Sequence, residues 1–342
     1  MAKHKQRLPD RKSRITVSDV ARSAQVSEST VSRIMRNQGL VADATREKVM
    51  ASVRALGYVP NRIAGSLASL DSRLVGVVIP SLSNIVFPEV LQGIHAALAG
   101  TDHQAVISVT DYDIDHEETL VRGLLAWQPA AILIAGFSHT EATRKMLGQS
   151  GVRVVEMMDI DSTPIDVAVG LSHRRAGHAT GRHLIARGYR RFGYVGHDWI
   201  ADSRARLRYD GLCQALAEAG LQITAHALSD GASSVAAGRE QTARLRALAP
   251  QIDVAVYSND DMAVGGVFHC LGAGISLPQD MAVFGFNGLE IGRELPQPLS
   301  TIRSNRFLIG QRAVEVVLGA GELQSHSKVI DTGFEIFAGA TA

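Results

Sequence analysis

Residues 74–80 read LVGVVIP, a short run of apolar and mostly β-branched residues that ends at a proline. A run that is apolar at nearly every position is typical of a strand buried on both faces of a parallel sheet. Six more runs of this kind follow: QAVISV at 104–109, AAILIAG at 130–136, VRVVEM at 152–157, RFGYVG at 191–196, DVAVYS at 253–258 and MAVFGF at 281–286. Their repetition predicts parallel sheet.

Segments of helix length separate these runs. They include residues 84–99, 115–127, 172–187, 203–219 and 260–271. The alternation of strand and helix predicts an α/β fold with right-handed crossovers. About 270 residues with about ten strands suit two doubly wound lobes better than one, because a single hydrophobic core stops growing near that size.

The totals place the chain among soluble globular proteins. It has 342 residues, of which 46% are hydrophobic and 20% are charged. No apolar run reaches the roughly 18 residues that a membrane helix needs, and the N-terminal MAKHKQRLPDRKSR has no apolar segment behind its charges. We therefore expect a cytoplasmic protein in which Cys213 and Cys270 are reduced thiols.

Upstream of the first strand the apolar pattern becomes helical. One helical face carries Val17, Val20, Ala21 and Ala24, and a second carries Val31, Ile34 and Met35. Thr16 and Ser27 are good N-cap residues before these two faces. A third stripe lies in DATREKVMASVRALGY at 43–58, where Gly57 is a natural stop. The pattern predicts a small all-α head in which a tight turn joins the first two helices.

The net charge of +1 hides two oppositely charged parts. Residues up to Arg73 contain 14 Lys/Arg and 6 Asp/Glu, whereas the remainder contains 21 Lys/Arg and 28 Asp/Glu. A basic head is suited to DNA, because Lys and Arg that neutralise phosphates release counterions. We interpret residues 1–14 as a solvated basic tail and the head as a DNA-binding module. A helical hairpin without a DNA role is the alternative.

The sequence lacks the common enzyme motifs of α/β proteins. No G-x-G-x-x-G follows a strand, and no G-x-x-x-x-G-K-[ST], G-x-S-x-G or H-E-x-x-H occurs. Two segments, TDYDIDHEE at 110–118 and GHDWIADS at 196–203, gather carboxylates and histidines that are able to bind a metal or move protons. Loop carboxylates are more often solvated, so we predict no catalytic residue, no metal and no cofactor.

Open α/β sheets bind ligands beyond the carboxyl ends of their strands. Polar side chains follow several of the predicted strands, namely Ser81, Asn84, Asp159, Asn259 and Asn287. Arg204 and Arg208, beyond RFGYVG, are able to form charge-assisted hydrogen bonds with an acidic group. We also assign Phe87 to this predicted effector site, which suits a polyhydroxylated small molecule.

The head segments ITVSDVARSAQVSESTVSRIMRN at 15–37 and TREKVMASVRALGYVPNRIAGSLA at 45–68 strongly resemble the DNA-binding head of the LacI/GalR family of bacterial repressors. The segments GVVIPSLSNIVFPEVLQGI, RHLIARGYRRFGYVGH, SNDDMAVGGVF and LPQDMAVFGFNGLEIGRELPQPLSTI resemble the family's effector-binding core. The resemblance implies an α/β core of two lobes, like the periplasmic sugar-binding proteins, preceded by a helix-turn-helix head. It also implies a homodimer, or a dimer of dimers, on a pseudo-palindromic double-stranded operator.

The implied organisation has four parts. They are a basic tail at 1–14, the helix-turn-helix head at 15–59, a hinge helix and linker at 60–72, and an effector-binding and dimerisation core at 73–340. The N-lobe is expected at about 73–171 and 303–330, and the C-lobe at about 172–302 and 331–340, so that the chain crosses between lobes three times. The absence of a heptad-bearing tail after GFEIFAGATA favours the dimer over the tetramer.

In a helix-turn-helix unit the first side chains of the second helix reach the base edges. Here these are Glu28, Ser29 and Thr30, with Ser32, Arg33 and Asn37 able to meet bases or phosphates. We assign further DNA contacts in the head to Thr16, Val17, Ser27, Thr45 and Tyr58.

The segment YVPNRIAGSLAS at 58–69 is a poor helix, because it is short and contains Gly65. In the family it resembles, this hinge helix orders only when two copies pack in the minor groove of the operator. Leu67 would then be the apolar wedge, Asn61 and Arg62 would touch the backbone or groove floor, and Ala64 would allow close approach of the partner helix.

Within the family, PSLSNIVFPEVLQGI, VVEMMD, DVAVG and NDDMAVG resemble the gluconate-operon repressors most. Repressors of neutral sugars commonly have an aspartate where this chain has Asn287, and an aspartate would repel a bound carboxylate. We therefore expect a sugar-acid effector, gluconate before 6-phosphogluconate or 2-ketogluconate, that releases the operator. The alternatives are a co-repressor-dependent regulator of another sugar and a sugar-binding protein without a DNA role.

Overall fold

The computed structural model describes residues 15–35, 40–59, 72–199, 202–319 and 328–342. The chain forms two compact units, Met1–Asp71 and Ser72–Ala342. The predicted tail and the hinge segment at 60–71 lie outside the described residues.

The described part of the first unit is a head of three helices, as predicted: α1 (Val17–Ala24), α2 (Glu28–Met35) and α3 (Asp43–Leu56). Thr16 begins α1 with a capping box, in which its side chain and that of Asp19 each bond the other's backbone. The Ser27 hydroxyl accepts from the amide of Thr30 at 3.2 Å and begins α2. Gly57 ends α3 in the left-handed conformation. A small core holds the three helices together and includes Val20, Ala24, Val31, Ile34 and Val49.

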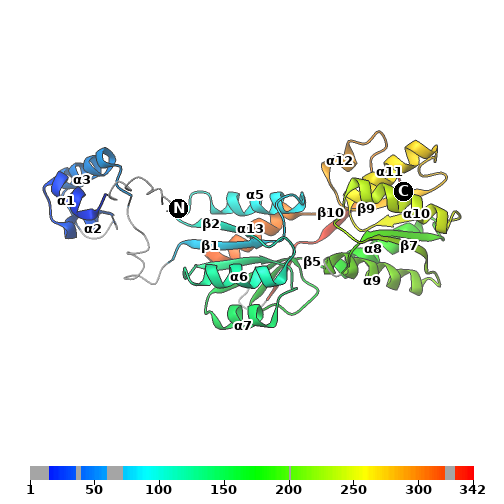
Figure 1. The fold of residues 1–342 in the computed structure, drawn as a ribbon, viewed down its shortest axis with the longest axis horizontal. Coiled ribbons are helices and arrows are strands. Elements are labelled where there is room, and N and C mark those ends of the chain that lie inside the picture. The colour runs from blue at the N-terminus through cyan, green and yellow to red at the C-terminus, as the bar shows by residue number, and fades with distance from the viewer. Residues whose placement is uncertain (1–14, 36–39, 60–71, 200–201, 320–327) are drawn as a thin grey trace, which may run out of the picture. The chain divides into compact units, whose positions relative to one another are not determined.

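The second unit contains two six-stranded sheets, which confirms the prediction of two doubly wound lobes. The first sheet has the order β11-β5-β4-β3-β1-β2 and all its strands are parallel. Its strands are β1 (Leu74–Ile79), β2 (Gln104–Val109), β3 (Ala131–Ala135), β4 (Arg153–Asp159), β5 (Val167–Leu171) and β11 (Val329–Asp331). Helices α5 (Val86–Leu98) and α13 (Arg306–Leu318) cover one face, and α6 (Ile114–Leu125) and α7 (Glu141–Gln149) cover the other (Figure 1).

The second sheet has the order β12-β10-β9-β8-β6-β7. Its strands are β6 (Phe192–His197), β7 (Ile223–Ser229), β8 (Val254–Tyr257), β9 (Ala282–Asn287), β10 (Ser300–Ser304) and β12 (Phe334–Phe337), of which β12 is antiparallel to β10. Helices α8 (His173–Ala186) and α9 (Ser203–Glu218) pack on one face, α10 (Val235–Leu248) and α11 (Asp260–Ala273) pack on the other, and a short α12 (Glu290–Arg293) follows β9.

All seven apolar runs of the sequence are strands: β1, β2, β3, β4, β6, β8 and β9. Three of the other strands, β7, β11 and β12, lack that signal for a physical reason. Strand β7 alternates exposed and half-buried residues at a sheet edge, and β11 and β12 are the partly exposed outer strands of their sheets. None of the helices that the structure describes is long and apolar enough to cross a membrane.

The chain passes from one sheet to the other three times: between β5 and α8, between β10 and α13, and between β11 and β12. Figure 1 shows these passages side by side in the middle of the core, with the strand ends of both lobes turned toward them. Three connections between two lobes leave a cleft at the carboxyl ends of the parallel strands, where ligands of open α/β sheets bind.

Candidate functional site

The first candidate surface is the amino-terminal turn of α2 in the head. Glu28 and Ser29 are exposed there, and Thr30 is half-buried. Glu28 accepts a hydrogen bond from the Ser18 hydroxyl at 2.6 Å, which joins α2 to α1. The Ser27 hydroxyl lies 2.8 Å from those of Ser29 and Thr30. These polar side chains are already oriented by one another, which suits a surface that presents them to a partner.

The other predicted DNA contacts differ in exposure. Arg33 is exposed on α2, while Ser32 and Thr45 are half-buried. Val17 and Tyr58 pack against the small core of the head, so each offers only part of its side chain to solvent. Asn37, Asn61, Arg62, Ala64 and Leu67 lie outside the described residues.

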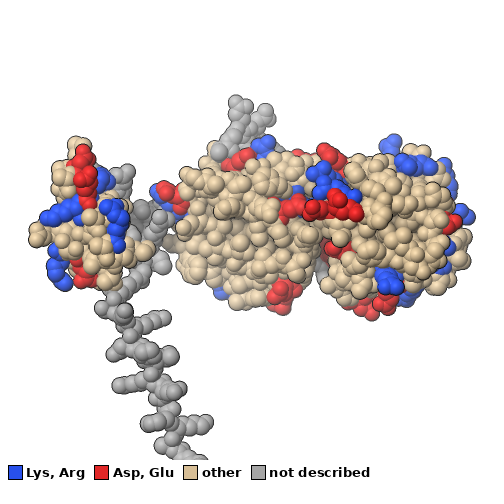
Figure 2. Space-filling model, turned by 90° about the horizontal axis from the view of Figure 1, so that it is seen from above, with Lys and Arg blue, Asp and Glu red and all other residues tan. Residues whose placement is uncertain are grey.

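The charge of the head is distributed differently from the expectation. The described residues 15–59 carry five basic side chains and four acidic ones, namely Arg22, Arg33, Arg46, Lys48, Arg54, Asp19, Glu28, Asp43 and Glu47. Figure 2 shows both signs on the viewed face of the head. Most of the basic excess therefore belongs to residues 1–14, which lie outside the described residues, and their interpretation as a solvated basic tail stays a prediction.

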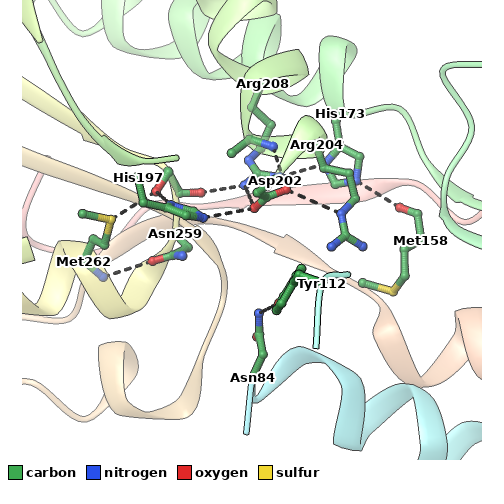
Figure 3. Close-up of polar contacts among 12 residues, drawn as sticks. Asn84, Tyr112, Met158, His173, His197, Asp202, Arg204, Arg208, Asn259 and Met262 are labelled. Carbon is green, nitrogen blue, oxygen red and sulfur yellow. Dashed lines mark hydrogen bonds and ion pairs between the residues drawn. The ribbon is translucent and has the colours of Figure 1, made fainter. Parts of the chain in front are cut away.

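The second candidate site is the cleft between the lobes of the core. On the N-lobe side, Asn84 follows β1 and donates a hydrogen bond from Nδ2 to the hydroxyl of Tyr112 at 2.9 Å (Figure 3). Tyr112 has a positive φ of 62°, so a left-handed turn after β2 presents its ring here. Ser81 shapes the β1–α5 turn, because its hydroxyl accepts from the amides of Ser83 and Asn84, both at 3.2 Å.

Arg208 is the buried centre of the C-lobe side, with 9% of its surface exposed. Its Nη1 donates to Nδ1 of His173 at 3.0 Å and its Nη2 donates to the carbonyl of Ser258 at 2.8 Å. Because an arginine only donates, His173 is neutral with its proton on Nε2, which bonds the Met158 carbonyl at 3.0 Å. Burial and Arg208 both lower the pKa of His173 well below its ordinary value. Arg208 is thus fixed in position with its plane over the ring of Phe286 at 4.1 Å.

Arg204 is one helical turn away and less completely bonded. Its Nη1 is buried and has no hydrogen-bond partner among the described residues. The guanidinium lies 5.7 Å from the centre of the Phe87 ring, which comes from α5 of the opposite lobe. Figure 3 shows it extended toward Tyr112 and Asn84. A buried cationic donor without a partner is costly, so this atom is a strong candidate to donate a hydrogen bond to a bound anion.

Asp202 and His197 are largely buried residues of this cleft that the sequence reasoning did not assign to the site, because it treated the carboxylates of GHDWIADS as solvated. The Asp202 carboxylate is 3.7 Å from Arg204, 3.9 Å from Arg208 and 3.5 Å from His197. Burial opposes its ionisation, but His197 and the two arginines outweigh burial and hold the pKa of Asp202 well below its usual range. It is therefore the anionic counterpart of both arginines.

Asp159 ends β4 with only 3% of its surface exposed. Its Oδ1 accepts from the amide of Asp161 at 2.9 Å. Burial raises the pKa of Asp159 to about 6, and Arg204 opposes the rise without cancelling it. The site therefore contains one carboxylate that is readily neutralised close to neutral pH.

The remaining predicted residues lie at the ends of β8 and β9. Asn259 is buried and caps α11, where its Oδ1 accepts from the amide of Met262 at 3.1 Å. Asn287 has a φ of 125°, a conformation that side-chain-bearing residues rarely adopt, and its carbonyl accepts from Arg306. Strain of this kind occurs where a surrounding network holds the backbone, and Arg306 is itself held by Glu89 at 2.9 Å.

A cavity of about 520 Å³, open to solvent, extends from Arg204 along the N-lobe strand ends. Its lining includes Thr110, Tyr112, Ser138 and Asp202. Across it, the hydroxyl of Ser138 in the N-lobe lies 3.1 Å from that of Ser203 in the C-lobe. The described residues contain no group of three or more His, Cys, Asp or Glu arranged to hold a metal ion. Arg204, Tyr112 and the hydroxyl groups of this lining suit the binding of an anionic polyol.

Comparisons with known proteins match both units of the chain to known families. Residues 16–61 match the family described as bacterial regulatory proteins, lacI family, and residues 72–332 match periplasmic binding proteins and sugar binding domain of LacI family. A regulator named GntR from Pseudomonas aeruginosa is 41% identical over 95% of each chain.

Two solved structures extend the comparison to three dimensions. A transcriptional regulator of the same family from Silicibacter pomeroyi has a TM-score of 0.90 at 43% identity, covering 96% of this chain and 99% of its own. The lac repressor dimer, bound to operator and the anti-inducer ONPF, has a TM-score of 0.85 at 26% identity over 96% and 99%.

Proposed function

This chain belongs to the LacI family of bacterial transcriptional regulators, and we propose that it represses genes of sugar-acid catabolism and leaves its operator when gluconate binds in the core. It is a DNA-binding regulator and not an enzyme. We propose the identity of the effector, the genes that the operator controls, and the loss of operator affinity when the effector binds. We further propose that it acts in the cytoplasm as a homodimer on a pseudo-palindromic operator. The similar lac repressor, solved as a dimer bound to operator, supports this part of the proposal.

The observation that carries the effector proposal is the unpartnered Nη1 of Arg204, buried at the edge of a cleft of polar side chains. A carboxylate placed there accepts a charge-assisted hydrogen bond from Nη1, for which no described residue provides an acceptor. Arg208 adds positive potential, while Asn84 and Tyr112 offer hydrogen bonds to hydroxyl groups. A neutral sugar would leave Nη1 of Arg204 without a charged acceptor, so the site favours a sugar acid. Gluconate is the first choice, ahead of 6-phosphogluconate and 2-ketogluconate.

The test is an effector titration of an operator complex. Full-length protein is used to select its operator from random double-stranded DNA, and fluorescence anisotropy then follows the complex as gluconate or glucose is added. We expect gluconate to weaken operator binding by about tenfold or more, the size of a typical coupling free energy, and glucose to have no effect. If gluconate tightens binding, the protein is a co-repressor-dependent regulator. If no sugar acid changes either the operator affinity or the melting temperature, the effector proposal is wrong.

Arg204→Gln separates effector binding from DNA binding. We expect the variant to bind the operator as the wild type does, and to lose about tenfold to a hundredfold in gluconate affinity, because a buried charged hydrogen bond is removed. Isothermal titration calorimetry measures the affinity. The control is Arg206→Gln on the same helix, since Arg206 is half-exposed and pairs with Asp210. Equal losses in both variants would contradict a direct role for Arg204.

A further inference from the structure

The cavity next to Arg204 has an acidic side that the proposed function does not use. Asp113, the N-cap residue of α6, and Glu117, in the first turns of that helix, both line it. Asp113 is exposed and its carboxylate accepts from the amides of Asp115 and His116. Glu117 is different, because only 6% of its surface is exposed. A carboxylate so deeply buried needs an explanation.

Glu117 is held by a buried histidine. Nδ1 of His139 lies 2.7 Å from Oε1 of Glu117, and Nε2 of the same ring lies 3.5 Å from Oε1 of Glu156. The side chains of His139 and Glu156 are fully buried. Burial by itself would lower the pKa of His139, but Glu117 and Glu156 outweigh it and raise that pKa to about 9. The ring is therefore a cation between two carboxylates at neutral pH.

The far end of this row is anchored to the backbone. Oε2 of Glu156 accepts from the amide of Ile165 at 2.5 Å, and Arg144 lies 3.8 Å from Oε1. The row Glu156–His139–Glu117 thus runs from the interior of the N-lobe to the cavity. Its residues come from β4, the β3–α7 loop and α6, so three elements fix the Glu117 carboxylate. An apolar trio would join these elements at a smaller desolvation cost.

The row ends at the wall of the cavity with one carboxylate oxygen free. Oε2 of Glu117 makes no hydrogen bond to a described residue, although Glu117 lines the cavity. An oriented carboxylate oxygen without a donor is suited to accept hydrogen bonds from hydroxyl groups. Ser138, the neighbour of His139 in the chain, lines the same wall and contacts Ser203 of the opposite lobe.

We propose that Glu117, held in place by His139 and Glu156, is a specificity residue of the effector site that accepts hydrogen bonds from the hydroxyl groups at the end of the effector away from its carboxylate. The inference rests on the proposed function, since it uses Arg204 as the site for the carboxylate end. Arg204 and Glu117 line the same cavity. Arg204 then binds one end of the effector, and the carboxylate of Glu117 binds the other end.

The experiment measures how affinity depends on the length of the ligand. Full-length protein without DNA is titrated by calorimetry with gluconate and with its shorter relatives xylonate and threonate, each of which lacks one more hydroxylated carbon. In the wild type we expect affinity to fall along the series, by about tenfold in total or more, because the shorter acids do not reach Glu117. In Glu117→Gln we expect a loss of about tenfold for gluconate and little change for threonate.

Asp115→Asn is the matched control, because Asp115 is exposed on the same helix turn, does not line the cavity and undergoes the same change of charge. It should leave the length dependence unchanged. Glu117→Asp keeps the carboxylate but shortens the side chain by one methylene group, which moves the oxygens away from the effector. This variant tests the role of Glu117 if Glu117→Gln fails to fold. Its length dependence should be reduced as well.

The outcomes distinguish the two proposals. Gluconate binding that is equally strong in wild type and in both Glu117 variants, or an equal loss for gluconate and threonate, overturns the role of Glu117 and leaves the proposed function standing. If none of the three acids binds the wild type or raises its melting temperature, the proposed function fails and the role of Glu117 fails with it.

Discussion

Asp159 shows how burial sets the chemistry of a single residue in this cleft. Its pKa of about 6 lies well above the ordinary aspartate value of 3.8, mainly because the carboxyl group is buried. Arg204 lies close enough to lower that pKa, so the two groups act in the same part of the site. The bound carboxylate of a sugar acid would repel the ionised form of Asp159 and tolerate the neutral form.

The affinity for gluconate should therefore depend on pH. As the pH falls from 8 to 5.5, Asp159 takes up its proton through the folded-state value of about 6, and affinity should rise by about tenfold at most. Calorimetry in buffers of different ionisation enthalpy should detect proton uptake on binding near pH 6.5. In Asp159→Asn the pH dependence and the proton uptake should both disappear. Proton release, or an unchanged pH profile in the variant, would contradict this role.

The sequence identified the candidate residues of the cleft by one rule, the position after a strand. That rule reached Asn84, Asp159 and Arg204, because strands and their ends are visible in the pattern of apolar residues. It did not reach His173, and Asp202 and Glu117, although they lie in segments that the sequence analysis singled out, were interpreted as solvated carboxylates. Their roles depend on burial and on partners distant in the chain, such as Arg208 for His173 at 3.0 Å, and no local pattern of the sequence contains that information.

At the scale of elements, the helices of the core are paired by glycines. In α8 and α9, a β-carbon at Gly177 would overlap the backbone of Arg208, and one at Gly211 would overlap the backbone of Arg174. The same reciprocal arrangement joins α5 to α13 through Gly93 and Gly310, and α10 to α11 through Gly238 and Gly265. Close backbone contact makes each pair rigid and positions the residues at its ends.

Gly177→Ala tests whether the α8–α9 contact positions Arg208. The new methyl group must separate the helices at the backbone of Arg208, which should lower the free energy of unfolding by about 1–3 kcal/mol and weaken gluconate binding. Thermal denaturation and calorimetry measure the two effects. Gly272→Ala in α11 is the control, because nothing lies within 4 Å of a β-carbon there, and helix propensity predicts an equal or slightly higher stability. A stable Gly177→Ala protein with full gluconate affinity would contradict the argument.

At the scale of the whole molecule, the chain divides at about residue 71 into a unit that carries the helix-turn-helix and a unit that carries the cleft. Each has its own hydrophobic core. We therefore expect binding of DNA and binding of effector to depend on separate sets of residues.

Arg33→Gln should separate the two activities in the direction opposite to Arg204→Gln. Arg33 is exposed on α2, so its loss should weaken operator binding by about tenfold or more, with gluconate affinity of the free protein unchanged. Arg54→Gln, at the exposed end of α3, is the control with the same loss of charge. Anisotropy on the selected operator and calorimetry with gluconate provide the two measurements. Equal operator affinity in wild type and Arg33→Gln would exclude a direct contact from this residue.

The sequence by itself determined the fold class, the division into a helical head and an α/β core, and the strand ends at which the effector site is proposed. Periodicity, caps and turn residues such as Thr16 and Gly57 act over a few residues, so they are visible in the chain. Only the tertiary structure decided which polar groups are buried together. The pairing of Asp202 with two arginines and the row Glu156–His139–Glu117 arise where separate elements converge, and burial there decides which charges remain paired and which atoms remain free for a ligand.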